Sequence, residues 1–310
     1  MRIVISLGGN ALLRRGEAVT ADNQRENIAR AALWLAPVIK THETVITHGN
    51  GPQLGLLALQ SFSYKAGEPT RLDVLCAQAG GMIGYLIERE LRNQLGKDHL
   101  LATLLTQIVV DPADPAFAKP TKPLGPFYEK IYAHQLRQLH GWDFGEFGGQ
   151  FRRLAAVPKA HAILELPTIE ALLKSGFTVI ASGGVPVTEL PSRGFLGAEA
   201  LPDKDAYASL LARAIGADAL ILLTDVLSVA TDYGKAGQRQ IRRATSIMLK
   251  AIDFDANTMR PKVEAASDFV YETGKWAAIG GISDVGRILA GEAGTRIVPA
   301  LPSAMEMWSG

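Results

Sequence analysis

The sequence predicts an α/β protein with a mostly parallel sheet and helices on both of its faces. Apolar runs typical of buried strands alternate with segments of helical periodicity, and glycine-rich loops follow three of those runs. In such a sheet, ligands bind beyond the carboxyl ends of the strands. The chain has 310 residues, which is long enough for one large α/β domain or two smaller lobes. Its net charge of +1 indicates no general attraction to nucleic acid or membranes.

The first elements are strands separated by long helices. Arg2–Leu7 and Val45–Thr47 are short apolar runs and are predicted strands, whereas apolar residues recur at helical spacing in Asn23–Ile39 and Asp73–Leu95. The second helix contains glycines, each of which costs about 1 kcal/mol relative to alanine. We expect close packing at a subunit interface or against a ligand loop to offset this cost. The alternative is a helix break at Gly80–Gly81.

Three further strands and one helix complete the predicted framework. Leu100–Val110 is apolar and bounded by turn residues, so it is predicted as a third strand. Thr178–Ala181 and Ala219–Leu223 are two more apolar runs, and the segment between them has helical spacing over Asp205–Ile215. This alternation predicts parallel strands joined by helices.

The segment Asp111–Pro158 does not follow this alternation. It begins with the proline-rich stretch DPADPAFAKPTKPLGPFYEK, and proline removes amide donors and blocks helix interiors. A disordered linker is one interpretation. The many aromatic residues instead favour a small packed excursion or lid.

Three glycine-rich loops are the candidate ligand site. They follow the predicted strands as Gly8-Gly9-Asn10, as the run from His48 to Pro52 that contains Gly49, Asn50 and Gly51, and as Ser182–Pro186 with Gly183 and Gly184. Glycine permits a close approach to the backbone, and helix N-termini attract anions. One such loop alone is equally well explained as a tight turn, but three loops at neighbouring strand ends predict a site for several anionic groups. None has the Walker or dinucleotide pattern.

Three lysines provide candidate positive charge. Lys204 and Lys262 are expected at the starts of two helices, and Lys122 lies in the proline-rich excursion. Phosphoryl transfer needs alignment and neutralised charge on the moving group, which converging amides and lysines would supply. Each lysine taken alone is more simply explained by a solvated surface position.

The remaining features exclude several other classes of protein. The single cysteine, Cys76, excludes an internal disulfide framework and fits a reducing cytosol, and no apolar stretch has the length of a membrane-spanning helix. The histidines show no zinc spacing, and we interpret His48 as structural. Arg152 and Arg153 either close the lid on anions or face solvent, and the solvent interpretation is slightly favoured.

Several blocks of the sequence resemble one enzyme family. The segments LGGNALL, ITHGNGPQLGLLALQ, GMIGYLIERELRN, VDPADPAFAKPTKPLGPFY, DKDAYASLLA and PKVEAA resemble the carbamate kinases of the amino acid kinase superfamily, in order and over nearly the whole chain. The resemblance implies an open three-layer αβα sandwich with a largely parallel eight-stranded sheet. It implies one domain over residues 1–310, a protruding lid over 111–158, and a homodimer. The implied reaction moves a phosphoryl group between MgATP and carbamate, giving carbamoyl phosphate and MgADP.

The resemblance also implies roles for individual residues. Lys204, Lys262 and Lys122 would neutralise the transferred phosphoryl group, and Asp205 would orient the first two lysines. The positions matching the phosphate and carbamate site are Gly8, Gly9, Asn10, Gly49, Asn50 and Gly51, with Gly183 and Gly184 in the third loop. The positions matching the nucleotide site are Thr224, Asp225, Val226, Met259 and Arg260. Mg²⁺ is expected to enter with ATP or ADP, and no residue is assigned as a metal ligand.

Three departures from the family pattern concern the nucleotide side. The third loop has two glycines where the family usually has four, and Ala230 stands at the position of a tyrosine near the adenine. In the run before Lys262, Arg260 stands where a glycine is usual. These changes leave open a kinase for another small carboxylate or carbamate, or a weakly catalytic nucleotide- or metabolite-binding paralogue.

Overall fold

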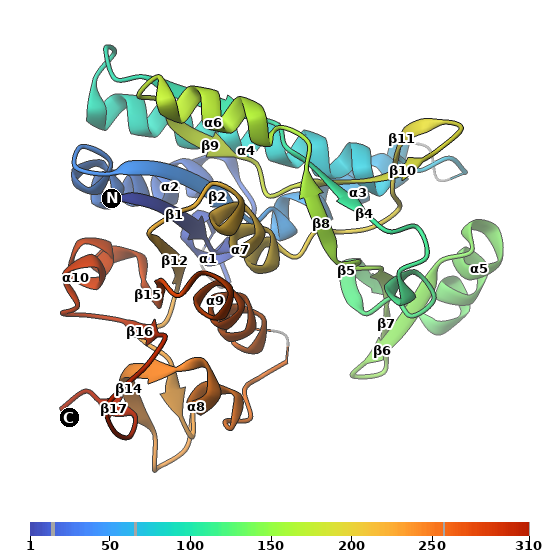
Figure 1. Ribbon diagram of the computed structural model, residues 1–310. Helices are drawn as coiled ribbons and strands as arrows, with labels where there is room; N and C mark the ends of the chain where they lie inside the picture. Colours follow the sequence, from blue (N-terminus) through green and yellow to red (C-terminus); the bar gives the residue numbers. More distant parts are fainter. Residues whose placement is uncertain (14–15, 65–66, 257, 310) are drawn as a thin grey trace.

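The computed structural model describes residues 1–13, 16–64, 67–256 and 258–309, and a largely parallel sheet runs through it (Figure 1). The sheet has ten strands in the described residues where eight were expected, because the two-residue strands β13 and β17 add to its edge at β14. In spatial order the strands are β13 (Ala230–Thr231), β14 (Arg239–Thr245), β16 (Thr295–Val298), β15 (Trp276–Gly281), β12 (Ala219–Thr224), β1 (Arg2–Leu7), β2 (Glu43–His48), β9 (Thr178–Ala181) and β3 (Leu101–Leu104), with β17 (Glu306–Met307) paired to β14.

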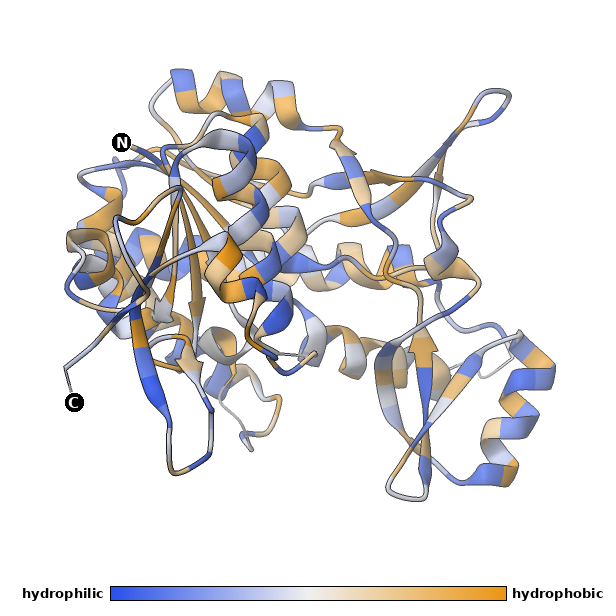
Figure 2. Ribbon diagram, turned by 60° about the horizontal axis from the view of Figure 1, so that its bottom comes forward, coloured by the Kyte–Doolittle hydropathy of each residue, from blue (hydrophilic) through white to orange (hydrophobic). Residues whose placement is uncertain are grey.

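Helices cover both faces of this sheet, so the three-layer prediction is confirmed. Successive side chains of a strand point to opposite faces, and in β1 Ile3 and Ile5 join one apolar cluster while Val4 joins the other. The first cluster is completed by α2 (Ala21–Ile39), α4 (Leu72–Leu95) and α10 (Val285–Ala290). The second is completed by α6 (Leu166–Lys174), α7 (Lys204–Ala214), α8 (Ser246–Lys250) and α9 (Arg260–Thr273). Figure 2 shows the apolar strands enclosed between these layers.

The long helix α4 is continuous through its glycines, so the alternative of a helix break is wrong. A Cβ atom on Gly84 would lie 2.5 Å from the Thr103 side chain of β3, and one on Gly80 would lie 3.1 Å from Ser182. The glycines therefore allow α4 to pack closely against the edge of the sheet. This packing offsets their low helix propensity.

The expected single strand over Leu100–Val110 is wrong, because it is two strands in different sheets. β3 pairs with β9 in the main sheet, whereas β4 (Gln107–Val110) pairs with β10 (Val185–Leu190) in a second sheet. The backbone bends between β3 and β4 and also between β9 and β10. At these two bends Thr106 donates its amide to the Ser182 hydroxyl at 3.0 Å. The order of the second sheet is β11 (Gly194–Gly197), β10, β4 and β8 (Ala160–Ile163).

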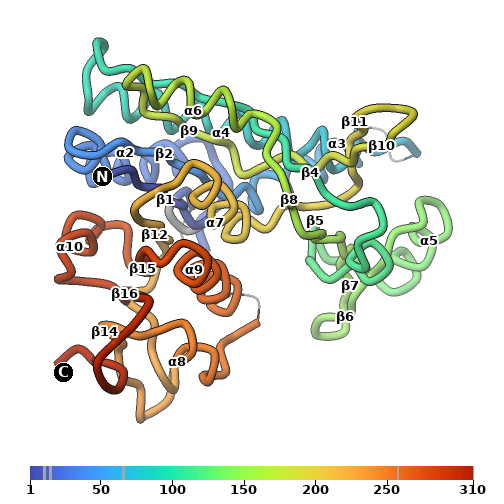
Figure 3. Tube along the Cα trace, viewed as in Figure 1, coloured from blue at the N-terminus to red at the C-terminus, as the bar shows by residue number. Residues whose placement is uncertain are grey.

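The proline-rich segment folds as a small subdomain at one end of the molecule (Figures 1 and 3). It contains the antiparallel sheet β5 (Lys122–Tyr128), β7 (Gln150–Ala155) and β6 (Asp143–Phe147), with α5 (Lys130–His140) packed on it. We call these elements the β5–β7 subdomain. Phe62 of α3 (Gly51–Tyr64) lies 6.2 Å from Trp142 between ring centroids, so aromatic packing joins the subdomain to the main body. In the described residues, no helix is long and apolar enough to cross a membrane.

Candidate active site

The carboxyl ends of three neighbouring strands bring the first two glycine loops together. β1 lies between β12 and β2. The amide of Gly8 donates to Leu223 of β12 at 3.0 Å, and the amide of Gly49 donates to Leu7 of β1 at 3.2 Å. A Cβ atom on Gly8 would meet that Leu223 oxygen at 2.8 Å, so the backbones meet as closely as glycine allows.

A pocket of about 460 Å³ lies in front of these loops, and we call it the lysine pocket. Its walls come from the second glycine loop, the β5–β7 subdomain and the starts of α7 and α9. The lining residues are Gly9, Gly49, Asn50, Gly51, Pro52, Leu54, Lys122, Pro123, Leu124, Arg152, Leu201, Pro202, Asp203, Lys204, Asp205, Thr258, Pro261 and Lys262. The structure thus gathers all four predicted catalytic residues at one pocket.

A buried ion-pair cluster forms the floor of the lysine pocket. Asp205 Oδ1 accepts from Lys204 Nζ at 2.5 Å, and Asp205 Oδ2 accepts from Lys262 Nζ at 3.1 Å. The side chains are 5%, 18% and 12% exposed for Asp205, Lys204 and Lys262. The carboxylate therefore holds two ammonium groups side by side, and the cluster keeps one net positive charge.

The environment shifts the ionisation of this cluster. Burial lowers the pKa of Lys204, and the charge of Lys262 adds to this effect, while Asp205 opposes it. Burial by itself would raise the pKa of Asp205, but the two lysine charges and hydrogen bonds outweigh it, so its pKa lies below the ordinary value. Asp205 is thus ionised at neutral pH and keeps the ammonium groups in place.

Local structure explains the position of Lys204. Asp203 caps α7 by accepting from the amides of Asp205 and Ala206 at 2.9 and 3.1 Å, so these amides are occupied rather than free for an anion. A Cβ atom on Gly49 would lie 2.7 Å from Lys204 Cδ. Glycine at position 49 therefore leaves the space in which the Lys204 side chain passes over the backbone of the second glycine loop.

A second pocket of about 630 Å³ lies beyond the end of β12, and we call it the β12 pocket. It shares Thr258 and Lys262 with the lysine pocket, so Lys262 stands at the junction of the two. Four of the five predicted nucleotide-side residues line it, namely Thr224, Asp225, Val226 and Met259.

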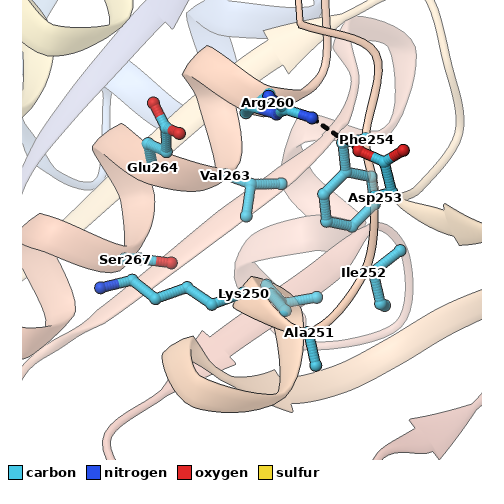
Figure 4. A pocket seen from close by; sticks show the side chains of 10 residues that line it. Lys250, Ala251, Ile252, Asp253, Phe254, Arg260, Val263, Glu264 and Ser267 are labelled. Atoms are coloured by element: carbon cyan, nitrogen blue, oxygen red, sulfur yellow. Dashed lines mark hydrogen bonds and ion pairs between the residues drawn. The ribbon is translucent and has the colours of Figure 1, made fainter.

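The fifth predicted residue, Arg260, lies outside the β12 pocket. Its guanidinium pairs with Asp253 at 2.6 Å and lines a neighbouring cavity of about 380 Å³ between α8 and α9 (Figure 4). Arg260 therefore does not occupy the position that the family resemblance suggested for it. Asn257, in the same run, lies outside the described residues.

Aromatic surface is present in the β12 pocket although Ala230 replaces the tyrosine of the family pattern. Tyr233, three residues further along the chain and 67% exposed, lines the pocket together with Phe254. Tyr233 could not be recognised from the family pattern, because the pattern places its tyrosine at the position of Ala230.

The structure does not bring Gly183 and Gly184 to either pocket. Both are buried, and a Cβ atom on Gly183 would lie 2.2 Å from the His48 carbonyl oxygen. Gly184 has φ +90°, where side chains are strained. These two glycines allow the chain to bend from β9 into β10 directly behind the second glycine loop.

Other predicted residues have supporting positions. Gly9 and Asn10 belong to the short helix α1 (Gly9–Leu12), and the side chain of Asn10 lies outside the described part. His48 is fully buried, and burial lowers its pKa to about 4, so the neutral ring is structural as expected. Asn50 lines the lysine pocket. Burial and nearby carboxylates raise the thiol pKa of Cys76 to about 12, and Asn50 opposes this shift.

The two adjacent arginines of β7 face different surroundings. Arg153 is buried against Trp142 and pairs with Glu199 at 2.7 Å, so the solvent interpretation is wrong for it. Arg152 lines the lysine pocket. Alternation along a strand would have separated the two residues, had β7 been recognised from the sequence.

In the described residues, no group of three or more His, Cys, Asp or Glu side chains is arranged to hold a metal ion.

The model of the amino acid kinase family matches residues 1–279, and the chain belongs to this family. Within it, the chain is 47% identical to the carbamate kinase of Rhizobium meliloti, over 96% of this chain and 93% of the relative. It is 45% identical to the carbamate kinase of Haemophilus influenzae, over 96% of each.

A solved structure shows the same architecture. The carbamate kinase of Giardia lamblia bound to AMP-PNP superimposes with a TM-score of 0.90 at 34% identity, covering 96% of this chain and 98% of the other. Similarity at this level over nearly the whole length groups the chain with the carbamate kinases.

Proposed function

We propose that the protein is a carbamate kinase that moves a phosphoryl group between MgATP and carbamate. The proposal is supported above all by the Lys204–Asp205–Lys262 cluster, which lies at the junction of the lysine pocket and the β12 pocket. The nucleotide binds in the β12 pocket and carbamate in the lysine pocket. This arrangement points the γ-phosphate at the acceptor across Lys262.

The reaction needs no covalent group from the protein. One carboxylate oxygen of carbamate attacks the γ-phosphorus of ATP, a P–O bond forms to that oxygen, and the bond to the bridging oxygen breaks to release ADP. Lys204 and Lys262 neutralise the charge on the equatorial oxygens, which is the main contribution that a protein makes to phosphoryl transfer. Asp205 keeps both ammonium groups aligned, and Lys122 contributes a third charge from β5.

Mg²⁺ enters as part of the nucleotide substrate. The described residues offer no cluster of carboxylates for a separate metal site, but Asp225 lines the β12 pocket near the predicted phosphate path. Asp225 would be the residue placed to hold the ion, which would neutralise phosphate charge during transfer.

Lid closure, dimer formation and a cytoplasmic location complete the proposal. The β5–β7 subdomain closes on the lysine pocket and carries Lys122 with it.

The apolar side chains Val74, Met82 and Tyr85 of α4 are between 37% and 59% exposed, which favours a homodimer contact on this helix. Light scattering coupled to gel filtration tests the dimer.

A substrate panel tests the proposed reaction. ATP formation from MgADP is measured with carbamoyl phosphate and with acetyl phosphate, and ADP formation from MgATP is measured with carbamate, acetate and other small acids. We expect carbamoyl phosphate and carbamate to give the highest kcat/KM. Higher turnover of another acid would assign a different acceptor, and ligand-induced thermal shifts without turnover would indicate a binding paralogue.

A further inference from the structure

Arg152 and Arg153 are adjacent on β7, yet only one of them has its charge neutralised. Arg153 is 8% exposed, donates to Glu199 Oε1 at 2.7 Å and lies 3.9 Å from the centroid of the Trp142 ring. Its ion pair joins the β5–β7 subdomain to the loop before α7. The charge of Arg153 is therefore used inside the protein.

Arg152 lies on the other face of the strand and lines the lysine pocket. Its Nε donates to the Gly125 carbonyl at 3.1 Å, and its Cζ lies 5.3 Å from the centroid of the Phe127 ring. Within the described residues, no carboxylate forms an ion pair with this guanidinium. Both terminal nitrogens and the full positive charge thus remain available to a ligand in the pocket.

The position of Arg152 depends on an irregularity in the neighbouring strand. The register between β5 and β7 shifts between Leu124 and Tyr128, and Gly125 within this shift has φ +73°. The irregularity leaves the Gly125 carbonyl outside the strand ladder, where it accepts from Arg152. The contact holds the inner nitrogen of the guanidinium and leaves its outer edge unoccupied.

The other cations of the pocket are ammonium groups. Lys204 and Lys262 share Asp205, and Lys122 lies on β5. An ammonium group acts as a point charge, whereas the planar fork of a guanidinium matches two oxygens in one plane. The pocket therefore offers one cation suited to a planar carboxyl group and three suited to phosphoryl oxygens.

We propose that Arg152 binds the planar carboxyl-derived group of the small acidic substrate, while the lysines bind the phosphoryl group. This inference rests on the proposed function. In carbamate, the guanidinium contacts both carboxyl oxygens. After transfer, one of these oxygens bridges to phosphorus, and Arg152 holds the remaining carbonyl oxygen of carbamoyl phosphate.

Steady-state kinetics with carbamoyl phosphate and MgADP test the assignment. In Arg152→Gln the KM for carbamoyl phosphate is expected to rise about 10- to 100-fold, the range of a charge-assisted hydrogen bond. The KM for MgADP and the inhibition constant of inorganic phosphate change less than about threefold, since the lysines hold the phosphates. Arg152→Lys, which keeps the charge but loses the fork, is intermediate. Arg137→Gln, an exposed change on α5 of the same subdomain, is the matched control with wild-type kinetics.

Three results would overturn the assignment. The first is a carbamoyl phosphate KM in Arg152→Gln within about twofold of the wild type. The second is an equal rise in the phosphate inhibition constant, because Arg152 would then bind the phosphoryl group. The third is an equal rise in both KM values together with a lower melting temperature, which would make the residue structural.

Thermal shifts separate this proposal from the proposed function. If the wild type is stabilised by carbamoyl phosphate without turning it over, and Arg152→Gln is not stabilised, the reaction is wrong and the role of Arg152 stands. If carbamoyl phosphate neither stabilises the wild type nor reacts, both proposals fall.

Discussion

Replacement of Asp205 by asparagine removes the negative charge that lies between two buried lysines. The two ammonium groups, held at 2.5 and 3.1 Å by the carboxylate, would then face each other without compensation. The asparagine side chain has nearly the same shape as the aspartate it replaces, so the effect measures charge. We expect both the stability of the protein and the rate of phosphoryl transfer to fall.

The magnitude follows from burial and distance. Two unit charges 4 Å apart attract by about 4 kcal/mol at an effective dielectric constant of 20, and removal of one partner of a buried pair costs about 3–5 kcal/mol. Because the lysine side chains keep 12–18% exposure, water relieves part of the loss, and we expect about 3 kcal/mol of unfolding free energy. Misplacement of two charge-neutralising groups lowers kcat by roughly 10²–10³.

The pH dependence has a defined sign. The pKa of Asp205 lies below its ordinary value in the folded protein, so its contribution to stability is present above the unfolded pKa of about 4 and is lost as the pH falls through the folded pKa. The stability difference between wild type and Asp205→Asn must narrow in acid. Loss of the carboxylate also lowers the pKa of Lys204 further, so the high-pH limb of the rate profile moves to lower pH.

Denaturant unfolding at several pH values and pH–rate profiles measure these effects. Asp268→Asn, an exposed change on α9, is the control, and its stability should stay within about 0.5 kcal/mol of the wild type. The reasoning is refuted if Asp205→Asn keeps more than about a tenth of kcat, or if its stability deficit is constant down to about pH 2.

Three further predictions concern the glycine loop and the two pockets. Both Lys204→Ala and Lys262→Ala should lower kcat by roughly 10²–10³. Only Lys262→Ala should also raise the KM for MgADP, because Lys262 lines both pockets. Equal KM values for MgADP in the two variants would contradict this. Tyr233→Ala should raise the KM for MgADP about fivefold, because roughly 1 kcal/mol of ring contact is lost. Tyr233→Phe should keep the wild-type KM. An unaltered KM in Tyr233→Ala would show that the ring does not contact the nucleotide. Gly183→Ala should lower the unfolding free energy by about 1–3 kcal/mol in denaturant titrations, because its Cβ would lie 2.2 Å from a backbone oxygen, and a stable variant would show that the bend relaxes easily.

The fold class, several of the main parallel strands and the family could be predicted from the amino-acid sequence. Apolar runs such as Arg2–Leu7, with Ile3, Val4 and Ile5 in succession, have strand length and a largely apolar composition, so burial in a parallel sheet is their stable outcome. The expected helix starts indicated Lys204 and Lys262, and the resemblance added Asp205; the fold brings the three within hydrogen-bond distance. These features depend on local pattern and on residue identity, both of which a single chain displays.

The neighbours that each residue meets could not be predicted in this way, because they depend on the folded chain. The bend that separates β3 from β4 depends on Ser182, 76 positions away from Thr106, and no local pattern records it. Gly183 belongs to a loop whose glycines are typical of a phosphate-binding loop, but the His48 carbonyl oxygen of β2 occupies the space beside it. Arg152 and Arg153 are identical and adjacent in sequence, yet strand alternation gives one an internal carboxylate and the other an open pocket. Charge and contact are properties of residues brought together across the chain, and packing rather than sequence order assigns them.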